Sequence, residues 1–136
     1  VYPDVTDSFL NSFKNINNFN LIKQRGDNLN MRMLNCIQEQ AKQAQKVVLF
    51  GSDIPDLTCE IIKDGVTRLD SCDAVLGPSI DGGYYLIGFN NFSENYMHSI
   101  NLQPENIRDS LEKKKLIYSE LVQLSDIDYP ADLLVI

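Results

Sequence analysis

Residues 47–50 form a continuous apolar run, Val-Val-Leu-Phe, and this run constrains the fold more than any other part of the chain. Such a run is typical of a strand that is covered on both faces inside an α/β sheet. A polar loop containing Asp53 follows at once, and Pro55 ends the extended stretch because proline has no N–H to give to a sheet. Ligands of open α/β sheets bind beyond the carboxyl ends of the strands, so we expect Asp53 to lie where ligands bind.

A second strand and loop repeat this arrangement further along the chain. Residues 74–76 predict a short strand, and the loop 77–83 that follows contains three glycines and Asp81. Paired glycines let a backbone come close to a ligand or adopt positive φ. Residues 84–89 are aromatic and β-branched and predict the next strand. Thr58 predicts the N-cap of a helix over 59–69, and an apolar stripe predicts a longer helix over 29–44.

The last part of the chain carries weaker signals. Pro104 is expected at the first position of a helix over 104–114. Residues 116–118 are a possible strand, and 121–124 are the better strand candidate. Asp126 and Asp128 would then lie at the carboxyl end of that last strand.

Size and charge limit the classes of function. The chain has 136 residues, and we expect residues 1–136 to form a single α/β domain. A net charge of −7 argues against binding to nucleic acid or to anionic membranes, since both require basic patches. A nucleotide is still compatible, because carboxylates can hold a divalent cation that bridges to phosphate. With no apolar run of membrane-helix length, we expect a soluble, cytoplasmic protein.

Four motifs together resemble those of a known family. They are GSDIPDLT at 51–58, LGPSIDGGYYLIGF at 76–89, QRGDNLNMRM at 24–33 and SDIDYPADL at 125–133. Their residues and order are similar to a GT-A glycosyltransferase-like family, long catalogued as uncharacterised, that includes the arsenosugar-biosynthesis type of glycosyltransferase. The resemblance implies a three-layer α/β/α sandwich of GT-A, or nucleotide-diphospho-sugar transferase, type with a mostly parallel mixed sheet.

The resemblance also implies a metal-dependent transfer of sugar from a nucleotide-diphospho-sugar to a small acceptor. Mg²⁺ or Mn²⁺ would stabilise the charge that grows on the leaving phosphate. Asp53 and Asp128 match the family's metal-ligand positions, and Asp126 and Asp56 are weaker candidates. From the residues alone, Asp53 could equally be a helix-capping acid.

Asp81 matches the position of a carboxylate near the acceptor, where it would take the proton from the acceptor hydroxyl. The alternative from the residues alone is an acid that merely stabilises a turn. Arg32 likewise has two interpretations, a phosphate-binding cation or a solvated surface arginine. The remaining substrate-binding candidates by resemblance are Gln24, Gly82, Gly83 and Tyr84.

The chain departs from the family pattern at its beginning. The usual first strand and glycine-rich basic loop, which hold the donor's base and phosphates, have no counterpart here. We therefore expect an N-terminally incomplete fold, either a fragment or a truncated homologue. Because a missing central strand exposes a sheet edge, a homodimer is a further expectation. Two other functions stay open: a nucleotidyltransferase of the guanylyl or cytidylyl kind, and a non-catalytic binding or assembly domain.

Overall fold

The structure is a computed structural model, and it describes residues 22–92 and 99–125. Its helices and strands alternate along the chain, except that two consecutive strands lie within residues 74–90. In order they are α2 (Leu29–Ala41), β1 (Lys46–Phe50), α3 (Cys59–Arg68), β2 (Ala74–Pro78), β3 (Tyr84–Asn90), α5 (Ile107–Lys113) and β4 (Tyr118–Glu120). No helix among these described residues is long and apolar enough to span a membrane.

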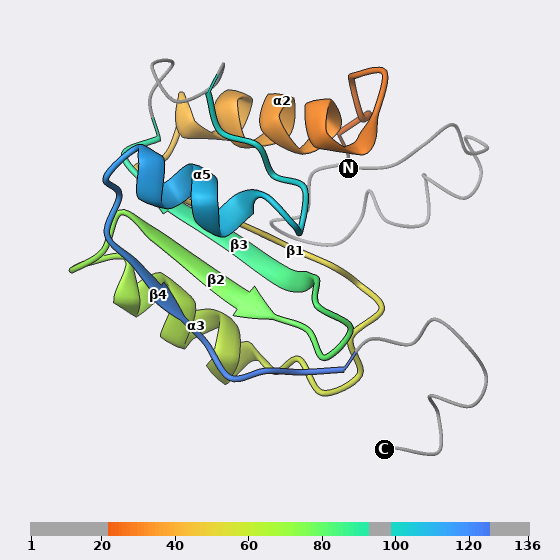
Figure 1. The fold of residues 1–136 in the computed structure, drawn as a ribbon, viewed down its shortest axis with the longest axis vertical. Helices are drawn as coiled ribbons and strands as arrows, with labels where there is room; N and C mark the ends of the chain where they lie inside the picture. The colour runs from red at the N-terminus through yellow and green to blue at the C-terminus, as the bar shows by residue number, and fades with distance from the viewer. Residues whose placement is uncertain (1–21, 93–98, 126–136) are drawn as a thin grey trace, which may run out of the picture.

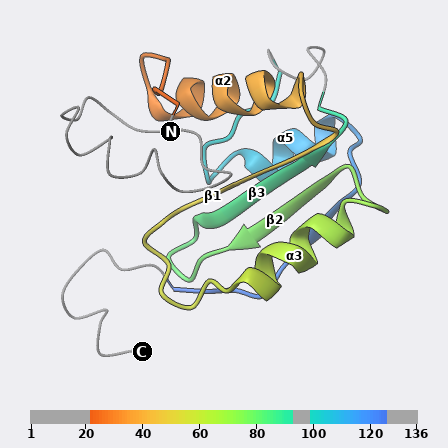
Figure 2. The same ribbon diagram turned by 180° about the vertical axis from the view of Figure 1, so that it is seen from behind.

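The four strands form one mixed sheet in the order β1-β3-β2-β4. β3 runs antiparallel to both of its neighbours, whereas β2 and β4 are parallel. Three of the four strands therefore point in the same direction. Helices α2 and α5 cover one face of the sheet and α3 covers the other (Figures 1 and 2). The expected α/β class, with a mixed sheet between helical layers, is confirmed.

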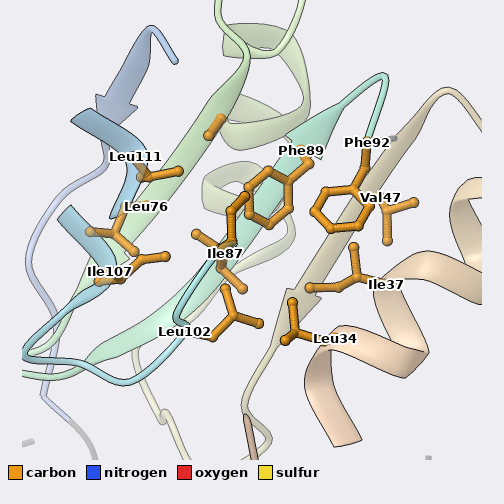
Figure 3. Close-up of a cluster of buried hydrophobic side chains, with 12 residues drawn as sticks. Leu34, Ile37, Val47, Leu76, Ile87, Phe89, Phe92, Leu102, Ile107 and Leu111 are labelled. Atoms are coloured by element: carbon orange, nitrogen blue, oxygen red, sulfur yellow. The ribbon is translucent and has the colours of Figure 1, made fainter. Parts of the chain in front are cut away.

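The larger core lies between the sheet and the pair α2 and α5. Figure 3 shows Leu34 and Ile37 of α2 beside Val47 of β1, and Leu111 of α5 beside Leu76 of β2. These five side chains are at most 8% exposed. Burying an aliphatic side chain of this size contributes about 1.5–3 kcal/mol each, so this layer holds both helices on the sheet.

The smaller core lies between the sheet and α3, and it includes Leu69, Val75 and Leu86. α3 begins as the sequence predicts, because the Thr58 side chain accepts a hydrogen bond from the Ile61 N–H at 3.3 Å. The longer helix α2 has an equivalent cap that uses Asn28, and it ends at Ala41, before the predicted end at 44.

Two predictions for the last part of the chain are wrong. The helix does not begin at Pro104, because a turn closed by the Asn106 N–H on the Gln103 carbonyl precedes α5, which begins at Ile107. Residues 121–124 form no strand; the strand there is β4, Tyr118–Glu120. β2 bulges between Gly77 and Pro78, and Pro78 has no N–H to continue the ladder.

The site-forming loops share one edge of the sheet. Phe50 at the end of β1 pairs with Leu86, and Pro78 at the end of β2 pairs with Tyr84, the first residue of β3. The Gly51 N–H continues this edge by donating to the Tyr85 carbonyl oxygen at 2.9 Å. The loops after β1 and β2 therefore lie at the same edge of the sheet, on either side of the start of β3, as expected for the carboxyl ends of strands that point in one direction.

Candidate functional site

A cleft of about 460 Å³ opens at this edge, on the face of the sheet that α2 covers. We call it the arginine cleft. The segment before α2, α2 itself, the end of β1 and the start of β3 all line it; the residues used below are Gln24, Arg32, Met33, Gly51, Ser52 and Tyr84. Its volume is in the range of sites for small molecules. Three predicted binding residues, Gln24, Arg32 and Tyr84, thus share one cleft.

Arg32 is held at the mouth of the arginine cleft by the loop that precedes α2. Its Nε donates to the Gly26 carbonyl oxygen at 3.1 Å, and its Nη1 lies 3.5 Å from Gln24 Oε1. Gly26 has φ +136°, and a Cβ at this position would lie 2.9 Å from the backbone nitrogen of Arg32. Glycine is therefore required here. Among the described lining residues Arg32 is the only Lys, Arg or His, and none is Asp or Glu. The cleft therefore favours an anionic ligand.

Asp53 lies beyond the end of β1, as predicted, but it does not line the arginine cleft. Its carboxylate folds back over the preceding turn, since a Cβ at Gly51 would lie 3.0 Å from Asp53 Oδ1. Ser52, which lines the cleft, immediately precedes Asp53 in the sequence. In the described part of the chain, no three His, Cys, Asp or Glu side chains gather into a possible metal site. Asp126 and Asp128 lie outside the described residues.

Asp81 stabilises the loop between β2 and β3. Its Oδ1 accepts hydrogen bonds from the Gly83 N–H at 3.0 Å and from the Ser79 hydroxyl. This is the turn geometry that the sequence offered as the alternative to a catalytic role. Gly82 has φ +93° with no atom within 4 Å of where its Cβ would lie, so the turn itself requires the glycine. The role of Asp81 as a proton acceptor stays a prediction.

Tyr84 follows this loop directly and separates the arginine cleft from a second one. Its hydroxyl donates to the Leu102 carbonyl oxygen, and burial raises the pKa of this phenol. On the other side of the same peptide segment, the Leu102 N–H donates to Asn30 Oδ1 at 2.8 Å. The Tyr84 hydroxyl is therefore already hydrogen-bonded within the fold, and the residue lines both clefts.

The second cleft, of about 480 Å³, lies between the start of α2 and the segment before α5. We call it the amide cleft, because Asn28, Asn30, Gln103 and Glu105 supply its polar groups. It shares Leu29, Met33 and Tyr84 with the arginine cleft. Asn28 is recognisable in sequence as a helix cap, but nothing local to Gln103 or Glu105 indicates that they approach α2.

Comparison with known proteins places the chain in a family. The family model described as "uncharacterized protein conserved in bacteria" (DUF2064) matches residues 2–102, about three quarters of the chain. The chain belongs to this family. The match to DUF2064 includes the motifs at 24–33, 51–58 and 76–89, and so covers Arg32, Asp53 and the loop of Asp81. A search of curated proteins gives no match.

One solved structure carries the comparison further. It is a protein from Desulfovibrio desulfuricans G20, provisionally described as a nucleotide-diphospho-sugar transferase. This chain is 32% identical to it over 78% of its own length, with a TM-score of 0.69. The match covers 49% of the other protein, so this DUF2064 chain spans about half of that length. The expected likeness to the GT-A-like family and its fold is confirmed at this level.

Proposed function

We propose that this chain carries part of the active site of a nucleotide-diphospho-sugar transferase, which moves the sugar to a small acceptor. The arginine cleft is the observation that carries the proposal. In a chain of net charge −7, its described lining has one cation and no carboxylate. A cleft of this character selects an anion, and a nucleotide diphosphate is the anion that the related structure's description suggests.

Each group in the arginine cleft would have a definite task toward a diphosphate. The Arg32 guanidinium retains donors beyond those directed at Gly26 and Gln24, and a guanidinium binds phosphate oxygens in pairs. The Ser52 hydroxyl lies at the end of β1, where it would donate to an anion entering from the edge. The apolar side of the cleft, including Met33 and the Tyr84 ring, would exclude water from the ligand.

The proposal also includes a divalent cation, Mg²⁺ or Mn²⁺. The described residues provide Asp53, an exposed carboxylate next to the arginine cleft, whose oxygen suits Mg²⁺ or Mn²⁺. Asp53 would hold the ion, and phosphate oxygens of the donor together with Asp128 would be its further ligands. Bound there, the ion would offset the negative charge of the diphosphate.

Asp81 and its loop are proposed to face the acceptor. The turn formed with Gly83 fixes one carboxylate oxygen, Oδ1, and so orients the whole carboxylate. A carboxylate held in this way would take the proton from an acceptor hydroxyl. The likeness to arsenosugar-type glycosyltransferases predicts a small, hydroxyl-bearing acceptor.

The proposal is tested by calorimetric titration of UDP-, GDP- and CDP-sugars into the chain, with and without Mn²⁺. Arg32→Gln should weaken binding of the preferred nucleotide sugar roughly tenfold or more, because a hydrogen bond to a charged group is lost. Lys42→Gln is the matched control: it removes the same charge at the other end of α2. Equal binding by Arg32→Gln and the unaltered chain would overturn the assignment of the cleft.

The same titration separates the alternatives. Preference for a nucleoside triphosphate, with release of pyrophosphate when a phosphorylated small molecule is added, would identify a nucleotidyltransferase. A folded chain that binds neither class of nucleotide would be the non-catalytic domain. Asp53→Asn should abolish the part of the affinity that depends on Mn²⁺ and leave metal-free binding unchanged.

A further inference from the structure

β1 is the outer strand of the described sheet, next to β3 (Figure 2). Just beyond its two ends, the Gly51 N–H donates to the Tyr85 carbonyl oxygen at 2.9 Å, and the Gln45 carbonyl oxygen accepts from the Asn91 N–H at 2.8 Å. The register between these two contacts is unbroken, and hydrogen-bonded pairs alternate along an antiparallel ladder. Every second residue from Gln45 to Gly51 therefore directs its backbone groups to β3.

The residues between them are Lys46, Val48 and Phe50, and their N–H and C=O groups point to the outer edge. Within residues 22–92 and 99–125, no group forms a hydrogen bond with these backbone atoms. A row of unpaired N–H and C=O groups on a strand is a template for pairing with another strand. The outer edge of β1 therefore has the backbone groups that a further strand would need.

β1 also lacks the features that normally prevent such pairing. Edge strands are usually protected by proline, by a bulge or by charged side chains. Residues 46–50 contain no proline, pair with β3 without a bulge, and carry a single charge, at their first position. The opposite edge differs, because β4 has three residues and two of its side chains, Ser119 and Glu120, accept hydrogen bonds from arginines. β1 is the more open of the two edges.

The outer edge of β1 is complementary to itself. In an antiparallel pair of two copies with a two-fold axis at Val48, this residue lies opposite its own counterpart, and Lys46 lies opposite Phe50 of the second copy. All three residues then exchange hydrogen bonds. An axis at either neighbouring residue leaves one of the three without a counterpart in β1. An axis between two residues would set outward groups against groups that already bond to β3.

The side chains of two copies paired in this way also fit together. Val47 belongs to the larger core and Val48 packs on the smaller one, so Lys46 and Phe50 lie on the α3 face with Val48. Phe50 is 48% exposed. Lys46 Nζ contacts Asp70, just after α3, which leaves the methylene stem of the lysine to cover the Phe50 ring of the second copy. Pairing would thus bury an aromatic ring and place no like charges opposite each other.

We infer that the outer edge of β1 is an interface with a second copy of this chain, formed by antiparallel pairing about Val48. The two four-stranded sheets would form one continuous sheet. The inference does not depend on the proposed function, because it uses only the backbone of β1 and the side chains beside it. Since Phe50 also lines the arginine cleft, the second copy would lie next to that cleft.

The test is sedimentation velocity of the full chain over a wide range of concentrations, together with amide hydrogen exchange followed by NMR. A monomer–dimer equilibrium is expected. With increasing concentration, the amide protons of Lys46, Val48 and Phe50 should gain protection, whereas those of Val47 and Leu49, which bond to β3, should be protected at every concentration. A dimer formed through another surface would not produce this alternation.

Two substitutions of Phe50 separate this pairing from general hydrophobic association. Phe50→Lys should raise the dissociation constant of the dimer about tenfold, because a like charge then lies opposite Lys46 in both symmetric pairs. Phe50→Glu sets an opposite charge there and should stay within about threefold of the unaltered chain. Ile117→Lys is the matched control, since it replaces an apolar side chain that is 65% exposed just before β4, at the other edge of the sheet.

Val48→Pro removes the central N–H, which makes no bond to β3, and should abolish dimerisation with an unchanged circular dichroism spectrum. If this variant does not fold, the two Phe50 variants decide. A chain that stays monomeric at every concentration would overturn the inference, and so would equal weakening by Phe50→Lys and Phe50→Glu. Protection of Lys46, Val48 and Phe50 that is independent of concentration would also overturn it, because the same chain would then cover its own edge.

Discussion

The hydroxyl of Tyr84 donates a hydrogen bond to the backbone carbonyl oxygen of Leu102, and this contact joins the first residue of β3 to the segment before α5. Leu102 is 2% exposed, and its N–H is bound by Asn30 of α2. Three elements therefore meet at one peptide segment. Because Tyr84 and Leu102 both line the amide cleft, the same contacts that stabilise the fold also shape this cleft.

Removing the Tyr84 hydroxyl should destabilise the fold. Tyr84→Phe leaves a buried carbonyl oxygen without its partner, and we expect the free energy of unfolding to fall by about 1–3 kcal/mol. Urea denaturation measures this. Tyr118→Phe is the control, since that hydroxyl reaches Glu112 only at 3.5 Å on the surface, and its loss should cost about 0–0.5 kcal/mol. Equal losses in the two variants would contradict a special role for Tyr84.

The same tyrosine predicts a dependence of stability on alkaline pH. Burial raises the pKa of Tyr84 above its ordinary value of 10.0, so the folded chain keeps this proton at pH values where the unfolded chain releases it. Its contribution to stability is complete below pH 10.0 and is lost as pH rises above that value. Urea denaturation at several pH values should show a shallower decline for Tyr84→Phe than for the unaltered chain. Identical slopes would mean that Tyr84 does not titrate differently on folding.

Asn30 should matter through its side-chain oxygen. Asn30→Ala leaves the Leu102 N–H without an acceptor, and we expect a loss of about 1–2 kcal/mol in the free energy of unfolding. Asn30→Asp keeps an oxygen in the same place and should retain most of the stability. Thermal unfolding of the two variants side by side measures the difference. If Asp were as damaging as Ala, the hydrogen bond to Leu102 would not be the reason for the loss.

The parts of the fold that sequence could predict are those whose cause is local. β1 and α3 follow from an apolar run and from the Thr58 cap, and both lie where they were predicted. The start of α5 and the position of β4 depend instead on distant partners. Leu102 is anchored by Asn30, 72 positions earlier in the chain, and β4 is placed by its parallel pairing with Ala74 to Leu76 of β2. No local pattern carries that information.

The candidate site likewise contains features that local sequence could predict and features that depend on distant contacts. Gln24 and Arg32 could be expected together because they lie eight positions apart, on either side of a turn that leads into a helix. The asparagines of the amide cleft could not be predicted from local sequence, since this cleft forms only where the turn containing Glu105 lies against the start of α2. Asp53 lies at the predicted end of β1, and its expected partner Asp128 is outside the described residues.

One substitution at Asp81 can distinguish its role in the turn from its proposed role as proton acceptor. Asp81→Asn keeps the side-chain oxygen that accepts from Gly83 and Ser79, so the free energy of unfolding should change by less than about 0.5 kcal/mol. If Asp81 takes the acceptor's proton, turnover of the nucleotide sugar in the active enzyme should fall by about 10²–10⁴-fold, with little change in donor affinity. Steady-state kinetics measures both. Unchanged turnover would leave Asp81 with the turn role alone.

Two glycines near the site should respond differently to alanine. A Cβ at Gly77 would lie 2.5 Å from the ring of Tyr85, whose hydroxyl is tied to the Val122 carbonyl oxygen at 2.7 Å, so the ring cannot move away freely. Gly77→Ala should therefore cost about 1–3 kcal/mol through overpacking. Gly82→Ala meets no neighbouring atom and should cost roughly 1–2 kcal/mol from its φ of +93° alone.

Urea denaturation of the two glycine variants measures these losses, and a double variant with Tyr85→Ala shows their origin. Removing the ring should relieve the clash at Gly77, so the extra cost of Gly77→Ala in the Tyr85→Ala background should fall to near zero. The cost of Gly82→Ala should stay the same in either background, because backbone conformation causes it. An undiminished cost at Gly77 without the ring would show that the backbone of β2, with its bulge at Pro78, is what excludes a side chain there.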